Sequence, residues 1–273
     1  ELEGIETTTG PLAQGLANGV GFALAEQILS SKFGKKTIDH YTYVFVGDGC
    51  LMEGLSHEAC SLAGHLGLSK LIVFFDDNSI SIDGSTGLSV SEDTIKRYES
   101  YGWNTLSING HNHKEIFDAI LLAKKNVSPT LIACKTKIGF GSPNKESNSS
   151  SHGSPLGEEE IELTRKNLNW PYGTFELPAD LVETWRNFYK RTASHKSAWD
   201  KHNHQLTSSP QYEDFFSKLL ATKVKEVITK FKDHHFKNQT NCATRKASEL
   251  SLEIITPLMK NLIGGSADLT GSN

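Results

Sequence analysis

The sequence predicts an α/β fold in which a parallel sheet carries helices on both faces. Three short apolar runs, rich in β-branched and aromatic residues, are typical of buried strands and cover residues 42–46, 71–75 and 130–134. Segments with apolar residues at helical spacing lie between these runs. Alternating strands and helices favour a parallel sheet, because each crossover helix must bury its apolar face against that sheet.

Three helices are predicted around these strands. The first covers residues 12–32, where four apolar side chains recur every four residues: Leu16, Val20, Leu24 and Ile28. The second covers residues 55–66, with the expected apolar positions Leu55, Ala59, Leu62, Ala63 and Leu66. The third covers residues 114–125.

The second half of the chain changes character. Residues 141–157 are rich in Ser, Asn, Gly and Pro, which indicates a loop, and we expect it to be mobile until something binds it. Glu158, Glu159 and Glu160 then begin a helix, where negative charge suits the helix dipole. Residues 179–237 are charged and helical in pattern. Near Ala247 another helix is expected, followed by a strand at residues 261–263.

Composition narrows the class of protein. The net charge of −4 gives no sign of the excess positive charge with which proteins bind nucleic acid or an anionic membrane. No apolar run approaches the roughly 18 residues of a membrane span. The four cysteines form no CxxC pair, which points to a reducing compartment, the cytoplasm. The 273 residues suffice for one large domain or two small ones, and a chain that opens on Glu1 looks like part of something longer.

Two polar motifs follow the first two predicted strands. Gly47-Asp48-Gly49 ends the first strand, and Asp76-Asp77-Asn78 ends the second. Roughly thirty residues separate the motifs, about what a strand, a helix and a return strand require, so both should meet at one sheet edge. A carboxylate and a carboxamide oxygen there suit a hard cation that also holds a diphosphate, Mg²⁺ or Ca²⁺. The alternative is an Asx-type turn followed by an acidic loop.

Several longer blocks of sequence carry a family resemblance. The segments 47–59 (GDGCLMEGLSHEA) and 76–84 (DDNSISIDG) resemble transketolases, which bind thiamine diphosphate. Further matching segments are 61–64, 139–145 and 266–270. These blocks run through nearly the whole chain. The resemblance implies the thiamine diphosphate-binding fold, with a helical connection and an incomplete second α/β domain after it.

The resemblance implies a metal site at the two motifs. Asp48 and the side chain of Asn78 would hold Mg²⁺, for which Ca²⁺ can substitute, and the backbone carbonyl of Ile80 would add a third oxygen. The ion would bridge to the diphosphate of the cofactor, with backbone N–H groups near Gly49 helping. Without the family, Ile80 reads as an ordinary loop residue.

Gly10, Pro11 and Leu12 would line the cofactor in the same family. From the residues themselves, this tripeptide reads as a capping turn with Pro11 near the first helical position. Ala13 stands where the family usually has glycine, which bears on the backbone geometry there.

Three further residues match binding positions of the family. His152 would contact the diphosphate and the substrate, in a binding and catalytic role, although a histidine in such a loop is more often a surface residue. Arg245 and Ser272 would hold the sugar phosphate, and Arg245 would otherwise pass for a solvated helix charge. Gly271 replaces a frequent proline beside Ser272.

The implied function is that of a transketolase, a homodimeric transferase of the pentose phosphate pathway that moves a two-carbon ketol unit between sugar phosphates. Residues 1–178 would form the diphosphate- and Mg²⁺-binding domain, 179–242 a helical connection, and 243–273 the start of the pyrimidine-binding domain. The family's activating glutamate belongs beyond residue 273, so we expect about half an active site and no full reaction from this chain unaided. The alternative is a non-catalytic or split cofactor-binding module that another chain completes.

Overall fold

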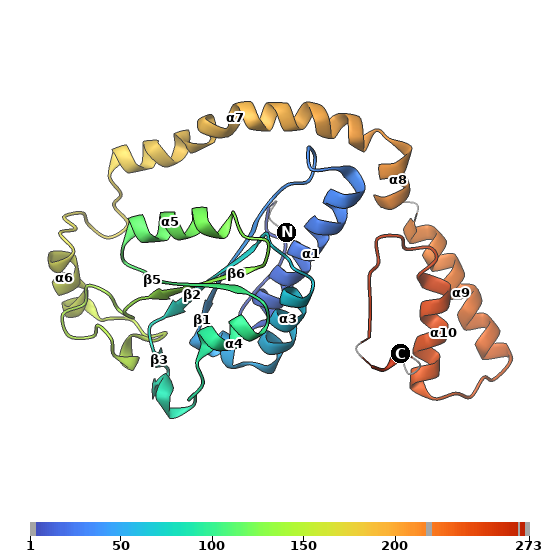
Figure 1. Cartoon of the computed structure of the whole chain (residues 1–273), viewed down its shortest axis with the longest axis horizontal. Helices are drawn as coiled ribbons and strands as arrows, with labels where there is room; N and C mark the ends of the chain where they lie inside the picture. The colour runs from blue at the N-terminus through green and yellow to red at the C-terminus, as the bar shows by residue number, and fades with distance from the viewer. Residues whose placement is uncertain (1–3, 217–219, 267, 271–273) are drawn as a thin grey trace. The chain divides into compact units, whose positions relative to one another are not determined.

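The computed structural model describes residues 4–216, 220–266 and 268–270 (Figure 1). The chain divides into two compact units, Glu1–Arg191 and Thr192–Asn273. The first unit contains a parallel sheet and its covering helices, and the second is helical. The α/β class predicted from the sequence is confirmed, whereas the bounds of the three predicted domains stay a prediction.

Four parallel strands form the main sheet within the described residues. They are β1 (Thr42–Gly47), β2 (Leu71–Asp77), β5 (Asn104–Asn109) and β6 (Thr130–Lys135), in the order β1-β2-β6-β5. The first five residues of β2 are all buried, as expected of an inner strand covered on both faces. Strand β5 was not predicted, because its sequence NTLSIN mixes polar with apolar residues, as suits its place at the edge of the sheet.

Helices cover both faces of this sheet (Figure 1). On one face, α1 (Gln14–Phe33), α3 (Gly54–His65) and α4 (Thr94–Ser100) enclose the larger core. On the other face, α5 (His113–Ala123) packs over β2, β5 and β6. The helices predicted over residues 12–32, 55–66 and 114–125 correspond to α1, α3 and α5, while α4 was not predicted.

Shorter elements surround the carboxyl ends of the strands. They are α2 (Asp48–Met52), β3 (Ile80–Ser81), β4 (Gly84–Ser85), η1 (Thr86–Leu88), η2 (Ser149–Ser151) and α6 (Glu158–Asn167). The long helix α7 (Ala179–Thr207) contains the boundary between the two units. It is followed by α8 (Pro210–Phe216), α9 (Leu220–Lys237) and α10 (Thr244–Ile255). Among the described residues, no helix is long and apolar enough to cross a membrane.

The buried face of α3 matches the predicted one only in part. Ala63 is buried and Ala59 packs against the core as predicted, but Ser56 and Cys60 are buried too, while Leu55, Leu62 and the C-cap Leu66 are exposed. A Cβ on Gly64 would lie 1.8 Å from the backbone oxygen of Tyr101, so α3 approaches the turn after α4 too closely for larger side chains. Close approach therefore decides which face is buried, and the leucine pattern misled the prediction.

The strand predicted at residues 261–263 is wrong. These residues follow α10 as a turn and irregular backbone. A strand requires a neighbour to pair with its N–H and C=O groups, and the second unit has none among its described residues. The apolar residues there had the right composition for a strand but no sheet to join.

Candidate functional site

The ends of two neighbouring strands bring the two polar motifs together. Asp48 follows β1 and opens α2, and Asn78 follows β2. Gly47 lies opposite Asp76 in the parallel pair, so both motifs occupy the carboxyl edge of the sheet. Asp48 and Asn78 line one cavity of about 740 Å³. The predicted strand–helix–strand arrangement is therefore the one that the structure adopts.

Most of the predicted site residues lie around this cavity. The predicted residues that line it are Leu12, Asp48, Gly49, Asn78, Ile80 and His152. Gly10 and Pro11 line a neighbouring cavity of about 450 Å³ beside α1 and β1, and Leu12 lines both. A Cβ on Gly49 would meet the Leu12 side chain at 3.2 Å, so the loop before α1 rests against the turn after β1.

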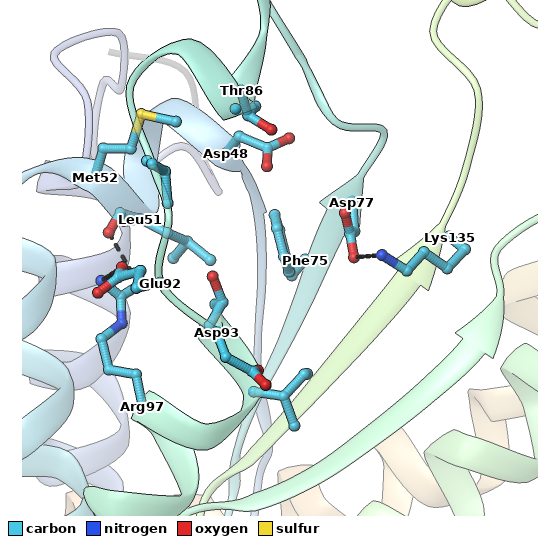
Figure 2. A pocket seen from close by; sticks show the side chains of 14 residues that line it. Asp48, Leu51, Met52, Phe75, Asp77, Thr86, Glu92, Asp93, Arg97 and Lys135 are labelled. Atoms are coloured by element: carbon cyan, nitrogen blue, oxygen red, sulfur yellow. Dashed lines mark hydrogen bonds and ion pairs between the residues drawn. The ribbon is translucent and has the colours of Figure 1, made fainter.

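Asp48 has the chemistry of an incomplete ion site. Its Oδ2 atom is buried and has no hydrogen-bond partner among the described residues. Burial, followed by the nearby charge of Asp77, raises the pKa of the Asp48 carboxyl to about 6. A cation beside this oxygen would relieve both effects. Asp48 also lines a second cavity of about 300 Å³, which Figure 2 shows together with Asp77 and Lys135.

The loop after β2 holds Asn78 in a defined orientation. Its Oδ1 accepts a hydrogen bond of 2.9 Å from the backbone N–H of Ile80, which leaves that oxygen a second lone pair. Ser79 between them has a φ of 62°, in the left-handed region that non-glycine residues enter at a cost of roughly 1 kcal/mol or more. The strained residue thus lies between the two residues that are predicted to supply oxygen ligands.

The two aspartates before Asn78 pair with residues at the end of β6, and Asp76 also accepts a hydrogen bond of 3.5 Å from the side-chain nitrogen of Asn78. The Thr136 hydroxyl donates to Asp76, and the Lys135 ammonium pairs with Asp77. Both partners come from β6 or the residue after it, so these carboxylates tie the end of β2 to its neighbour. These partners indicate a structural role for both carboxylates rather than a role as metal ligands.

The loop that carries His152 is built around a buried carboxylate. Glu160 accepts hydrogen bonds from the Ser142 hydroxyl and, at 2.8 Å each, from the backbone and side-chain nitrogens of Asn144. These bonds, that of Ser142 first, hold the pKa of Glu160 below its usual value. The Ser151 hydroxyl donates to the Lys145 carbonyl at 2.6 Å. Glu160 thus organises the loop, beyond the dipole role predicted for it.

Comparison with known proteins adds the family. A family model described as "Transketolase, thiamine diphosphate binding domain" matches residues 1–225. The chain belongs to the transketolase family. It is 50% identical to the transketolase of Buchnera aphidicola subsp. Schizaphis graminum and 45% identical to that of Cereibacter sphaeroides; these matches cover 100% and 99% of the chain. The chain spans about two fifths of the length of these relatives, 42% and 41%.

Solved transketolase structures share the fold. The chain matches transketolase from Leishmania mexicana with a TM-score of 0.83 and 38% identity, and that from Campylobacter jejuni with 0.82 and 35%. Each match covers 98% of this chain and 41% of the other. The thiamine diphosphate-binding fold expected from the resemblance is thereby confirmed.

Two predicted residues are distant in sequence from those that line the cavity. Arg245 lies in the first turn of α10, in the second unit, with an exposed side chain. Ser272 lies outside the described residues. The transketolase-like roles of both in phosphate binding stay predictions.

In the described part of the chain, no group of three or more His, Cys, Asp or Glu side chains is arranged to bind a metal ion. The predicted set would not be such a cluster, because it combines one carboxylate with an amide oxygen and a backbone carbonyl.

Sequence reasoning missed Lys137, which also lines the large cavity and pairs with Glu146 at 2.7 Å. Its place two residues after β6, at the carboxyl edge of the sheet, was the available signal.

Ala13, the departure from the usual transketolase glycine, adopts a left-handed conformation. Its φ is 63° and its side chain is almost fully buried. Ala13→Gly would relieve about 1–2 kcal/mol of backbone strain, but would lose about 0.8 kcal/mol of methyl burial and about 0.5–1 kcal/mol of chain entropy. We expect the free energy of unfolding in urea to change by less than about 1 kcal/mol. A loss above about 2 kcal/mol would show that methyl packing dominates.

Proposed function

We propose that this chain supplies the Mg²⁺- and diphosphate-binding half of a transketolase active site. The complete enzyme would transfer a two-carbon ketol unit from a ketose phosphate to an aldose phosphate in the pentose phosphate pathway, as a cytoplasmic homodimer. The observation that best supports the proposal is the buried Oδ2 of Asp48, which has no partner in the described part of the chain and lies at a cavity shared with Asn78 and His152. Family membership supports the reaction class.

The donor set fits a hard cation. Asp48 and Asn78 would hold Mg²⁺ through their side-chain oxygens, and Ile80 through its backbone carbonyl; Ca²⁺ accepts the same ligands. The charge of Asp48, which is disfavoured without a counter-ion, would be offset by the metal. The backbone N–H of Gly49 would donate to the diphosphate, and a Cβ at this position would require the Leu12 side chain, 3.2 Å away, to shift slightly.

Thiamine diphosphate, when bound, would supply the electron sink for breaking the carbon–carbon bond beside a ketone. The residues of this chain would bind and orient the reactants. His152, at the cavity wall, would donate a ring N–H to a phosphate oxygen or sugar hydroxyl. Leu12 would present an apolar surface to the cofactor. Arg245 and Ser272 would hold the sugar phosphate, Arg245 through its planar guanidinium.

Calorimetric titration of the chain with thiamine diphosphate tests the proposal. We expect binding with Mg²⁺ or Ca²⁺ and none with a chelator. Ketol transfer is expected only when the remaining part of a transketolase is added, since the chain would hold half a site. Metal-dependent binding without transfer in that mixture would favour the alternative, a non-catalytic module. Absence of metal-dependent binding would contradict the proposed function.

The pH dependence of metal binding gives a separate prediction. Because a metal ligand must be ionised, protonation of Asp48 competes with the cation. With its pKa raised to about 6, the affinity for Mn²⁺ should fall up to tenfold per pH unit below about pH 6 and level off above it. Mn²⁺ without cofactor avoids titration of the diphosphate, and paramagnetic resonance measures the free ion. A fall confined to pH values near 4 would indicate an ordinary aspartate instead.

A further inference from the structure

Arg97 of α4 binds the turn that follows the metal-binding aspartate. Its side chain is 9% exposed. Nη2 donates to the backbone carbonyl of Leu51 at 3.0 Å, while Nη1 donates to Glu92 at 2.6 Å and to Nε2 of His57 at 2.7 Å. Figure 2 shows the guanidinium beside Leu51, on the wall of the cavity that Asp48 also lines. One side chain thus joins α4 to the α2 turn.

The groups around Arg97 hold its guanidinium in place. An arginine N–H can only donate, so the His57 ring, whose Nε2 and Nδ1 lie 2.7 Å and 3.4 Å from Nη1, is the acceptor in this contact. The Nδ1 atom of His57 also lies 3.1 Å from the Tyr101 hydroxyl. The Tyr98 ring lies 5.5 Å from the guanidinium carbon, within the range of a cation–π contact. The position of Arg97 is therefore determined by packing and not by a flexible surface contact.

The hydrogen bond to the Leu51 carbonyl is important for the geometry of α2 because this helix is short. The helix has five residues, begins at Asp48 and ends at Met52. So short a helix cannot stabilise itself in water, so its geometry depends on outside contacts. The buried hydroxyl of Ser56 lies 3.2 Å from the Leu51 carbonyl and donates to the Glu53 carbonyl at 2.7 Å. Arg97 supplies the charged contact from a different element.

We propose that Arg97 is a positioning residue for the cofactor and metal site: by anchoring the end of α2, it keeps Asp48 and Gly49 in their binding geometry before any ion arrives. This inference rests on the proposed function of Asp48. Arg97 acts through the Leu51 carbonyl and touches neither metal nor cofactor. A lysine at this position would keep the charge, but a single ammonium lacks the planar fork that serves Leu51, Glu92 and His57 together.

The test compares Arg97→Gln with a matched control, Trp103→Phe. The control also removes a buried side-chain donor to a backbone carbonyl, the 2.8 Å bond from the Trp103 indole to Cys60 in the neighbouring α3. Two quantities are measured on the whole chain: the dissociation constant for Mn²⁺ by paramagnetic resonance, and amide hydrogen exchange at residues 48–54. The urea midpoint of each variant reports its loss of overall stability.

Arg97→Gln is expected to raise the Mn²⁺ dissociation constant about tenfold and to speed exchange at residues 48–54. Trp103→Phe should leave both within about twofold despite a comparable fall in urea midpoint. Arg97→Lys should fall between Arg97→Gln and the original chain. An unchanged dissociation constant in Arg97→Gln, or an equal change in Trp103→Phe, would overturn the inference.

Two further outcomes have defined meanings. If the original chain binds no Mn²⁺, the proposed function fails, and exchange at residues 48–54 decides the positioning claim: faster exchange in Arg97→Gln alone supports the anchoring of α2, and equal exchange overturns it. If Arg97→Gln does not fold, Glu92→Gln replaces it, because Glu92 is 44% exposed and holds the same guanidinium. A two- to threefold weaker Mn²⁺ affinity is then expected, and an unchanged affinity overturns the inference.

Discussion

Replacing Asp48 with asparagine is expected to weaken Mg²⁺-dependent binding of thiamine diphosphate by roughly a hundredfold or more. The substitution preserves size but removes the charge that faces the cation. The oxygen atoms of Asn78 and Ile80 would remain as ligands, but both are uncharged. Calorimetric titration with and without Mg²⁺ measures the effect.

The same variant should make the metal-free chain more stable. The pKa of Asp48 is higher in the folded chain than in the unfolded one, so the folded state binds the proton more tightly. The contribution of the Asp48 carboxyl to the stability of the fold is fully present below about pH 4 and is lost as the pH rises through about 6. Asp48→Asn should therefore match the original chain at pH 4 and exceed it above pH 6. The gain should be about 1 kcal/mol, since solvent screens a partly exposed carboxylate.

Asp83→Asn is the matched control, because Asp83 lines the same cavity but is exposed and outside the predicted ligand set. It should leave cofactor affinity within about twofold. Thermal unfolding across pH, in chelator, supplies the stability comparison. Equal losses of affinity in both variants would mean that general cavity charge, rather than a ligand at Asp48, governs binding.

Gly64→Ala is expected to destabilise the fold by about 3 kcal/mol, in the upper part of the range for overpacking. The new Cβ would lie 1.8 Å from the Tyr101 oxygen and 2.9 Å from its carbonyl carbon, so backbone must move. Such movement would also disturb the bond between the Trp103 indole and Cys60. The free energy of unfolding in urea measures the loss.

Gly21→Ala provides the opposite case for the same substitution. Gly21 lies inside α1, is exposed, and has no atom within 4 Å of its ideal Cβ in the described part of the chain. Alanine there should stabilise by up to about 1 kcal/mol through helix propensity. If Gly64→Ala proved as neutral as Gly21→Ala, α3 and the turn after α4 could not be in close backbone contact.

Prediction from sequence succeeded where structure depends on local pattern. Periodicity identified α1, α3 and α5, and apolar runs identified β1, β2 and β6. The rule that parallel strands end at one edge was enough to predict that Asp48 lies near Asn78. The edge strand β5 and the short helix α4 were not predicted, because neither carries enough apolar residues to form a periodic signal.

Tertiary packing accounts for the features of the site and the core that the sequence pattern did not predict. Three features depend on packing between segments distant in the chain: the burial of Cys60 in place of Leu62, the Arg97 contact with Leu51, and the lack of a hydrogen-bond partner for Asp48 Oδ2 among the described residues. Spacing records which residues recur along an element, but not how closely another backbone approaches it. The sequence alone predicted most of the strands and helices of the first unit, the family resemblance and the two polar motifs. Packing determined which faces are buried and which carboxylate oxygen has no hydrogen-bond partner among the described residues.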